Sequence, residues 1–381
     1  MRVLHIYRTY FPETQGGAQE SIRQLCLATQ SLGVDNTIFA LAHKPEPQEL
    51  SLPEGKLIRA KSWLEIASCD IGALAAIKRC RAAAEKSDII QIHYPWPFAD
   101  LMLPWIRRHR QPVVVTYISD IVRQNDSRLG KLYVPLRRRL LDSADRIVAS
   151  SPKYEQSSTV LQQYCNKLRT IPHCMGPIPH IPSAALEYWR IRFGTDFFLF
   201  VGVLRYYKGL DYLLQAASKV QAPIVIVGEG PEGDRLRKEA RKRALTNVHF
   251  VGAVNEQDKN ALFQICRAVV FPSHIRSEAF GMTLLEGARA ARPLITCEIG
   301  TGTTWINIDG ETGLVVSPAD GSGLAAAMNK LSCDLPLCKI LGAGAKTRWQ
   351  QFFTPDVVGH AYHDLYTELL QGQGPAMINT S

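Results

Sequence analysis

Short apolar segments alternate repeatedly with stretches of helical period along this chain. Five apolar segments occur in the first half of the chain, at 3–7, 34–41, 88–93, 112–118 and 146–151. Five more occur in the second half, at 197–204, 222–230, 247–254, 268–273 and 293–298. Continuous apolar runs of this length are typical of strands buried on both faces of a parallel sheet. The pattern predicts an α/β protein with two successive doubly wound, Rossmann-like domains.

A proline-rich segment lies between the two sets. It reads IPHCMGPIPHIP over 171–182, and its prolines exclude a regular helix or a central strand. A Thr-Pro pair at 354–355 then precedes a last helical pattern and is a typical helix start. We expect a first domain over 1–180, a second over 190–354, a helix over 355–370 that joins the first domain, and a disordered tail over 371–381.

Length and composition fit a two-domain globular protein. The 381 residues exceed one ordinary core, and 46% are apolar while 21% are charged. No apolar run is long enough for a membrane span or a signal peptide, so we expect a cytoplasmic location. The nine cysteines include no Cys-x-x-Cys pair, which predicts neither a disulfide framework nor a zinc site.

The net charge of +9 requires an explanation. Much of the excess lies at helix-like spacings in three segments, 106–110, 135–141 and 235–243. Because no nucleic-acid-binding signature accompanies them, we expect no nucleic-acid partner. A solvated helix face, an anionic lipid surface and a phosphorylated small molecule remain as readings.

The stretch SEAFGMTLLEGARAARP, at 277–293, carries the clearest chemistry. Glu278 lies just before a helix predicted over 282–291, and Glu286 lies inside that helix. Gly281 permits the turn between them, and the free amides from Gly281 through Met282 and Thr283 to Leu284 favour an anion. A phosphate at the helix end, with carboxylates nearby for hydroxyl groups, describes a sugar nucleotide.

The Glu-Ala-Phe-Gly motif, with seven residues between Glu278 and Glu286, resembles the signature of retaining glycosyltransferases of the GT-B fold. These belong to the glycogen-synthase-like class, glycosyltransferase family 4. The resemblance implies two Rossmann-like domains that face each other across a cleft, with the acceptor mostly on the first domain and the sugar nucleotide mostly on the second. It also implies that Glu278 contacts the donor hexose near the reacting carbon and that Glu286 holds the ribose, with Phe280, Gly281, Met282 and Thr283 around the donor.

A second segment, FVGVLRYYKGLDYLL at 200–214, resembles the family's phosphate-binding region. The resemblance gives Arg205 and Lys208 the role of clamping the diphosphate and stabilising its growing charge. The family commonly has Arg where this chain has Val203. Positions two apart on a strand point to the same side, so we expect Arg205 to reach the same place.

Two glycine-rich loops call for different interpretations. Gly16 and Gly17 precede the first predicted helix and resemble the family loop that closes over the donor. The segment GEGPEG at 228–233 fits the dinucleotide pattern Gly-x-Gly-x-x-Gly. Its two glutamates would repel a pyrophosphate and Pro231 lacks an amide donor, so we expect a family turn there and not a nicotinamide site.

The acceptor side departs from the family. Relatives usually carry a histidine after the strand at 112–118, and this chain has Ile118 there. His93 and Asp120 remain at strand ends expected to face the same crevice, although His93 is equally well read as an ordinary strand-end histidine.

No Asp-x-Asp pair occurs, so we expect no metal and no cofactor beyond the donor substrate. The segments VLRYYKGL and TYISDIVRQ look most like O-polysaccharide mannosyltransferases. This implies GDP-mannose as donor, a lipid-linked glycan as acceptor, and association with other polysaccharide-synthesis enzymes. Basic faces near Arg107 and Arg137 are expected to hold an anionic membrane. A donor of UDP-glucose or UDP-N-acetylglucosamine, a GT-B sugar-nucleotide epimerase and a non-catalytic scaffold stay open as alternatives.

Overall fold

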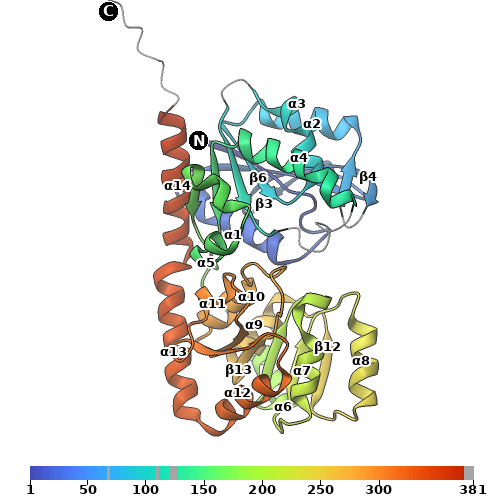
Figure 1. The fold of residues 1–381 in the computed structure, drawn as a ribbon, viewed down its shortest axis with the longest axis vertical. Coiled ribbons are helices and arrows are strands. Elements are labelled where there is room, and N and C mark those ends of the chain that lie inside the picture. The colour runs from blue at the N-terminus through green and yellow to red at the C-terminus, as the bar shows by residue number, and fades with distance from the viewer. Residues whose placement is uncertain (67–68, 109–110, 121–127, 373–381) are drawn as a thin grey trace, which may run out of the picture. The chain divides into compact units, whose positions relative to one another are not determined.

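A computed structural model describes residues 1–66, 69–108, 111–120 and 128–372 of the chain. It divides into two compact units, which are described separately (Figure 1). The first unit comprises Met1–Ser150, Ser158–Cys174 and Pro355–Ser381, and the second comprises Ser151–Ser157 and Met175–Thr354. Most of the expected disordered tail, from 373 on, lies outside the described residues, as do residues 121–124 of the TYISDIVRQ segment.

The first unit is built on a sheet of nine strands in the order β3-β4-β2-β1-β6-β7-β8-β9, with β5 paired to β4. The strands are β1 Arg2–Ile6, β2 Asp35–Ala42, β3 Glu49–Leu52, β4 Gly55–Ile66, β5 Cys69–Gly72, β6 Ile89–Tyr94, β7 Val113–Tyr117, β8 Arg146–Ala149 and β9 Leu168–Thr170. Only β3 and β5 run antiparallel to their neighbour β4 among these pairs. The strand order reverses between β1 and β6, which is where open α/β sheets bind ligands.

Helices cover this sheet. They are α1 Gly17–Gln30, α2 Leu74–Ala84, α3 Pro97–Ile106, α4 Arg128–Ser143, the 3₁₀ turn η1 Leu161–Lys167 and α14 Pro355–Gln371. The last of these, α14, packs on α1 (Figure 1), where Gly359 approaches the backbone of Ala28 so closely that a Cβ would lie 2.8 Å from the Ala28 oxygen. Among the described residues, the structure contains no helix with the length and apolar character needed to cross a membrane.

The second unit has a parallel six-stranded sheet in the order β12-β11-β10-β13-β14-β15. The strands are β10 Phe198–Val201, β11 Ile224–Val227, β12 Val248–Gly252, β13 Ala268–Phe271, β14 Leu294–Cys297 and β15 Gly313–Val316. Four of them are fully buried, and apart from Thr296 in β14 they are apolar runs such as the Ile-Val-Ile-Val of β11, because helices cover both faces of the sheet. The strand order reverses between β10 and β13.

The helices of the second unit carry the connections between these strands. They are α5 Pro152–Ser157, α6 Ser183–Phe193, the 3₁₀ turn η2 Tyr206–Lys208, α7 Leu210–Ala217, α8 Gly233–Lys242, α9 Glu256–Ile265, α10 Met282–Arg289, α11 Thr303–Ile306, α12 Gly321–Cys333 and α13 Leu335–Phe352. The caps agree with the sequence: the side chain of Asn255 accepts a hydrogen bond from the Asp258 amide at the start of α9.

The predicted α/β class with two doubly wound domains is confirmed. Several expected strands are too long. The apolar segment at 197–204 ends as a strand at Val201 and continues as a loop, and the segment at 222–230 ends as a strand at Val227. Five shorter or more polar strands, β3, β4, β5, β9 and β15, were not among the expected ones. The described cysteines are free, and all of them except Cys165 and Cys333 are buried.

Candidate active site

The candidate site lies at the switch point of the second unit, where β10 and β13 run side by side in parallel. The loop after β10 carries Arg205 and Lys208, and the loop after β13 carries Glu278. Because the carboxyl ends of parallel strands meet at one edge of a sheet, the fold brings these distant segments together.

Lys208 and Glu278 form a shielded ion pair. Lys208 Nζ lies 2.5 Å from Glu278 Oε2, and each residue is only 9% exposed. Ser273 Oγ donates to the same carboxylate oxygen over 3.2 Å, and the Lys208 ammonium lies 4.6 Å from the centre of the Phe271 ring. Charges in such a setting interact much more strongly than they do in water. The pair therefore presents one cation and one carboxylate that a charged, hydroxylated ligand can engage.

Gly209 explains why the Lys-Gly sequence is needed here. Its φ is 70°, and a Cβ at this position would lie 1.9 Å from the oxygen of Pro272. The backbone of His274 also donates to Tyr207 O over 3.2 Å. The loop after β10 is thus fastened to the loop after β13, which holds Lys208 against Glu278.

The GEGPEG loop packs closely against the loop after β10. A Cβ on Gly228 would lie 2.2 Å from Gly202 O, and one on Gly230 would lie 2.6 Å from the backbone of Leu204. Leu204 exchanges backbone hydrogen bonds with this loop, donating to Glu229 O and accepting from the amide of Glu232. These glycines are explained by the close approach of two loops and need no dinucleotide.

Arg205 is exposed, and it lies outside the strand on which it was expected. It does not lie on a strand two positions after Val203, because β10 has ended and Arg205 caps the short η2 turn. Strand alternation therefore does not fix its direction. Its diphosphate role remains a proposal based on the loop it shares with Lys208.

The amino end of α10 has the expected left-handed turn, with φ of 96° at Gly281. No described residue accepts a hydrogen bond from the amides of Gly281, Met282 and Thr283, whereas the amide of Leu284 bonds to Gly281 O and is wrongly included in the expected anion site. Thr283 Oγ1 donates to Val201 O over 3.1 Å. Phe280 and Met282 belong to the apolar core of the unit, so their side chains support the loop.

Glu286 is buried and also paired. Its Oε1 lies 2.7 Å from Lys259 Nζ on α9, and Lys259 also contacts Glu256 over 2.7 Å. Burial would lower the pKa of Lys259, but the charges of Glu286 and Glu256 raise it above its usual value. The sequence does not predict a role for Lys259 or Ser273, since nothing in the local pattern shows which carboxylate a distant lysine or serine will contact.

In the first unit, the switch point holds the other glycine loop. Helix α1 begins at Gly17, and Gly16 before it has extended backbone with φ of 178°. Asp120 follows β7, where its Oδ1 accepts from Tyr117 Oη over 2.9 Å and from Ser158 Oγ over 3.1 Å. Ile118 packs on the apolar cluster around Tyr7 and Tyr10.

His93 is a core residue with 1% exposure, and it lines a small, largely enclosed cavity. The amide of Asn36 donates to Cys26 O, so its Oδ1 accepts from His5 Nε2, and His5 Nδ1 then accepts from His93 Nε2 over 3.2 Å. This leaves His93 Nδ1 as a buried acceptor without a partner among the described residues. Burial lowers the pKa of His5 to about 4 and that of His93 well below its usual value.

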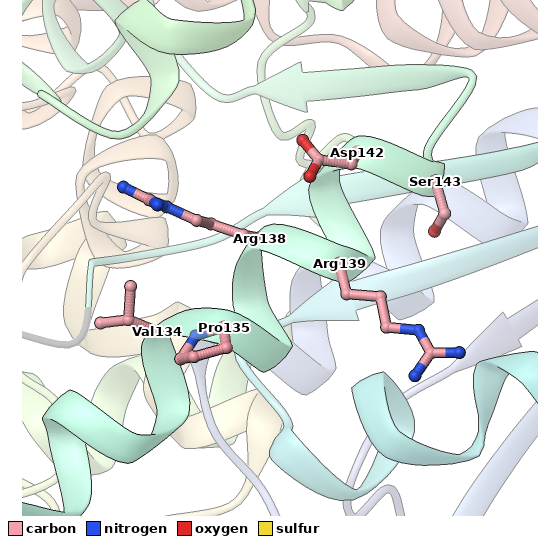
Figure 2. Close-up of a pocket in the computed structure, with 6 residues that line it drawn as sticks. All are labelled: Val134, Pro135, Arg138, Arg139, Asp142 and Ser143. Carbon is pink, nitrogen blue, oxygen red and sulfur yellow. The ribbon is translucent and has the colours of Figure 1, made fainter.

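Two other features of the first unit form neither a small-molecule site nor a metal site. A hollow on α4 is lined by Val134, Pro135, Arg138, Arg139, Asp142 and Ser143. Figure 2 shows its two arginines pointing away from each other, so they do not converge on one ligand. Within the described residues, ligand atoms of His43, Glu65 and Asp70 lie within 4.8 Å of one another, but the charge of Arg8 also acts on Asp70 and Ser62 donates to it, which disfavours a cation.

Both halves of the chain match families of known proteins. Residues 188–348 match the family described as glycosyl transferases group 1, and residues 16–172 match the glycosyl transferase 4-like domain. The chain is 46% identical over 375 residues to O-antigen chain mannosyltransferase C of Escherichia coli, covering 98% of this chain and 100% of the relative. It is also 46% identical over 356 residues to D-rhamnosyltransferase WbpZ of Pseudomonas aeruginosa, covering 93% and 92%.

Solved structures show the same fold at low identity. Sucrose-phosphate synthase from Thermosynechococcus elongatus superimposes with a TM-score of 0.80 at 20% identity, covering 97% of this chain and 99% of that one. WaaG, a glycosyltransferase involved in lipopolysaccharide biosynthesis, superimposes with a TM-score of 0.69 at 17% identity, covering 96% and 99%. The chain therefore belongs to the glycosyltransferases of the GT-B fold, with a glycosyl transferase 4-like first domain and a group 1 second domain.

Proposed function

We propose that this glycosyltransferase moves mannose from GDP-mannose to a lipid-linked glycan during bacterial O-antigen synthesis, with retention of the anomeric configuration. The observation that carries the proposal is the Lys208–Glu278 pair at the switch point, beside the open amides that begin α10. Support for the pathway comes from the relative named O-antigen chain mannosyltransferase C, which the chain matches over nearly its whole length.

In this proposal the site exchanges its internal contacts for those of the donor. Lys208, Arg205 and the amides of Gly281, Met282 and Thr283 hold the diphosphate, since a helix start and two cations favour an anion. Glu278, released from Lys208, accepts hydrogen bonds from hydroxyl groups of the hexose, and Glu286 accepts hydrogen bonds from those of the ribose. In the first unit, the proposal gives the Gly16–Gly17 loop a role in donor binding and Asp120 a role in acceptor binding.

The proposed transfer takes place on one face of the sugar. The bond from the anomeric carbon to the diphosphate oxygen breaks while the acceptor oxygen bonds to that carbon on the same face. The acceptor proton passes to the leaving diphosphate oxygen, so no protein nucleophile is needed. Lys208 and the helix amides stabilise the negative charge that grows on the diphosphate. Neither a metal ion nor a cofactor takes part in this proposal.

The test compares four donors with one lipid-linked acceptor: GDP-mannose, GDP-D-rhamnose, UDP-glucose and UDP-N-acetylglucosamine. D-rhamnose is 6-deoxymannose, and a site that hydrogen-bonds the 6-hydroxyl group strongly rejects the sugar that lacks it. We expect GDP-mannose to give the highest kcat/KM, an α-linked product by NMR, and full activity with a chelator present. A preference for GDP-D-rhamnose, whose sugar is the one in the name D-rhamnosyltransferase of the second relative, or for a UDP-sugar would replace the donor assignment.

Incubation without acceptor separates the remaining alternatives. An epimerase converts the sugar nucleotide, whereas a transferase hydrolyses it slowly at most. A scaffold shows no turnover with acceptor, and Ile118→His would then be the variant to examine for restored transfer.

We also propose that the first unit rests on an anionic membrane surface. Five large apolar side chains are exposed there on neighbouring elements, namely Trp63 and Leu64 of β4, Leu74 of α2, and Leu101 and Trp105 of α3. Helix α3 packs against both α2 and α4, and α4 exposes Arg138 and Arg139 (Figures 1 and 2). Interfacial tryptophans with nearby cations suit a bilayer surface.

The structure changes which arginines are available for lipid. Arg107 donates to Gln111 O, Ser143 O and Asp145, so it fastens α3 to the segment before β8. Arg137 is half-buried with its Nε enclosed by protein. The exposed pair Arg138 and Arg139 replaces them in the proposal.

Vesicle sedimentation at low salt tests this surface. We expect binding to vesicles with anionic lipid and little binding to neutral ones, and the double variant Arg138→Gln/Arg139→Gln to bind about 30-fold more weakly, at about 1 kcal/mol for each cation. The control replaces two exposed apolar residues of the second unit, Tyr188→Ser/Ile191→Ser, and keeps its binding. Wild-type protein that ignores anionic vesicles would remove the membrane proposal and leave the transfer reaction untouched.

A further inference from the structure

Lys259 is the charged partner of a buried carboxylate, Glu286. Glu286 is 6% exposed and lies in the middle of α10, away from the helix start that would stabilise a carboxylate. A buried carboxylate needs a partner to remain ionised, and Lys259 Nζ supplies it at 2.7 Å.

The pair is part of a double fastening between two helices. Lys259 and Asn260 are consecutive on α9, and Glu286 and Arg289 are one turn apart on α10. Lys259 bonds Glu286, while Arg289 donates to Asn260 Oδ1 over 2.6 Å. Two adjacent contacts fix both the position of α10 and the rotation of the Glu286 carboxylate.

The ion pair engages one oxygen of the carboxylate. Lys259 contacts Oε1 of Glu286, and no described residue bonds to Oε2. Lys259 also lowers the negative charge of a site that has to accept a diphosphate, as Lys208 does for Glu278.

We propose that Lys259 is a positioning residue. It orients Glu286 so that Oε2 accepts hydrogen bonds from the ribose hydroxyl groups of the nucleotide. This inference rests on the proposed function, in which Glu286 is the ribose carboxylate. Lys259 itself touches no part of the donor. It determines how strongly the site distinguishes a ribose from a sugar without hydroxyl groups.

The test measures the affinity of GDP and of 2′,3′-dideoxy-GDP by calorimetry, with UDP and its dideoxy analogue in parallel. In wild-type protein we expect the ribose form to bind at least about 10-fold more tightly, because hydrogen bonds to charged groups are strong. In Lys259→Met the ratio falls toward one, and Lys259→Arg, which retains the charge and the donors, restores it. A role in stability alone would weaken both ligands equally.

Glu256→Gln is the matched control, because it removes the exposed partner of Lys259 and leaves the Glu286 pair in place. Its ribose ratio stays at the wild-type value. If Lys259→Met does not fold, Lys259→Gln provides the same test with a donor but no charge, and its ratio falls below that of Lys259→Arg. A wild-type ratio in the folded Met or Gln variant overturns the inference alone. Wild-type protein that binds neither nucleotide, or binds both sugars equally, overturns the assigned role of Glu286 and this inference with it.

Discussion

The two units bury polar groups in opposite ways. At its switch point the second unit keeps charges inside and pairs them, Lys208 with Glu278 and Lys259 with Glu286. In the first unit, burial shifts the pKa values of His5, His93 and Asp100 toward the neutral form of each group. His5 and His93 share a hydrogen bond in the core, and burial raises the pKa of Asp100 to about 7, where Tyr133 donates to its carboxyl group.

This difference indicates which unit is suited to a charged ligand. A protein ion pair can be separated by a charged substrate at low cost, because each residue of the pair finds a new partner in the substrate. A buried neutral histidine or carboxyl group offers no such exchange, and its main consequence is that stability depends on pH. The contrast supports donor binding by the second unit and predicts acid sensitivity in the first.

The largest expected effect comes from breaking the charged pair. Lys208→Ala and Glu278→Ala should each lower turnover by about 2.7–4 kcal/mol of barrier, a factor of about 10² to 10³, if these groups stabilise the transition state. Steady-state kinetics with saturating donor measure this loss. Melting curves for each variant separate it from unfolding, since each substitution leaves a shielded charge without its partner.

Lys219→Ala is the control for the lysine, because Lys219 is an exposed residue of the same unit that donates to Ser322. Its turnover should equal that of wild-type protein. Folded Lys208 and Glu278 variants with unchanged turnover would remove the site assignment, and with it the functional contrast between the units.

The second prediction is that acid weakens the first unit selectively. His5 keeps a neutral form in the fold because burial lowers its pKa from 6.5 to about 4, so its contribution is complete above pH 6.5 and is lost as the pH falls to about 4. This amounts to about 3 kcal/mol, and His93 acts in the same direction. Asp100 opposes both, because its raised pKa makes the fold less stable as the pH rises from 3.8 to about 7.

Asp100→Asn should therefore increase the loss of stability that the two histidines cause at acid pH, because it removes the opposing carboxyl group. Between pH 6.5 and 4 we expect the free energy of opening of β1 and β6 to fall by at least about 3 kcal/mol in this variant and by less in wild-type protein. Hydrogen exchange read by mass spectrometry, corrected for the intrinsic rate at each pH, resolves the two units. Peptides from β10 and β13 serve as the internal reference, because the histidines of the second unit are exposed or half-buried. Equal losses in both units would contradict the contrast.

The sequence predicted the alternation of buried strands and the segments that meet at the switch point, because both follow from apolar runs and from motifs of a few residues. It could not predict that Lys259 meets Glu286 or that Ser273 donates to Glu278, since these contacts depend on how α9, α10 and the loop after β13 pack. The hydrogen bonds that join His93 to His5 and His5 to Asn36 could not be predicted either, because these residues lie far apart in the chain.

Arg205 shows where a correct motif was attached to a wrong local geometry. The chain leaves the strand at Val201, and the turn that follows is set by glycine contacts with the neighbouring loop. The motif located the residue, but the direction of its side chain depends on tertiary packing that the strand rule does not include.

Removal of Arg205 gives the third prediction. Arg205→Ala should weaken donor binding by about 10-fold, the value of one hydrogen bond to a charged group, with a loss that shrinks at high salt. Thermal shift with GDP-mannose at two salt concentrations measures it. Arg235→Ala is the matched control: its guanidinium is exposed and already paired with Asp211 and Glu232, so it should cost under about 1 kcal/mol of stability and no donor affinity. Equal donor binding in both variants would limit the clamp to Lys208 and the helix amides.

The smallest expected effect concerns the glycine loop of the first unit. A Cβ on Gly16 would meet only the end of the Gln19 side chain, at 2.9 Å, and its extended backbone suits any residue, so Gly16→Ala should change stability by less than about 1 kcal/mol. Gly228→Ala is the contrast, because its φ of 124° and the nearby Gly202 oxygen make a side chain costly. If Gly16→Ala remains as stable as wild-type protein but loses donor affinity, the glycine is there for a ligand that approaches the backbone. If donor affinity is also unchanged, donor contacts lie in the second unit and the loop after β1 leaves the proposed site.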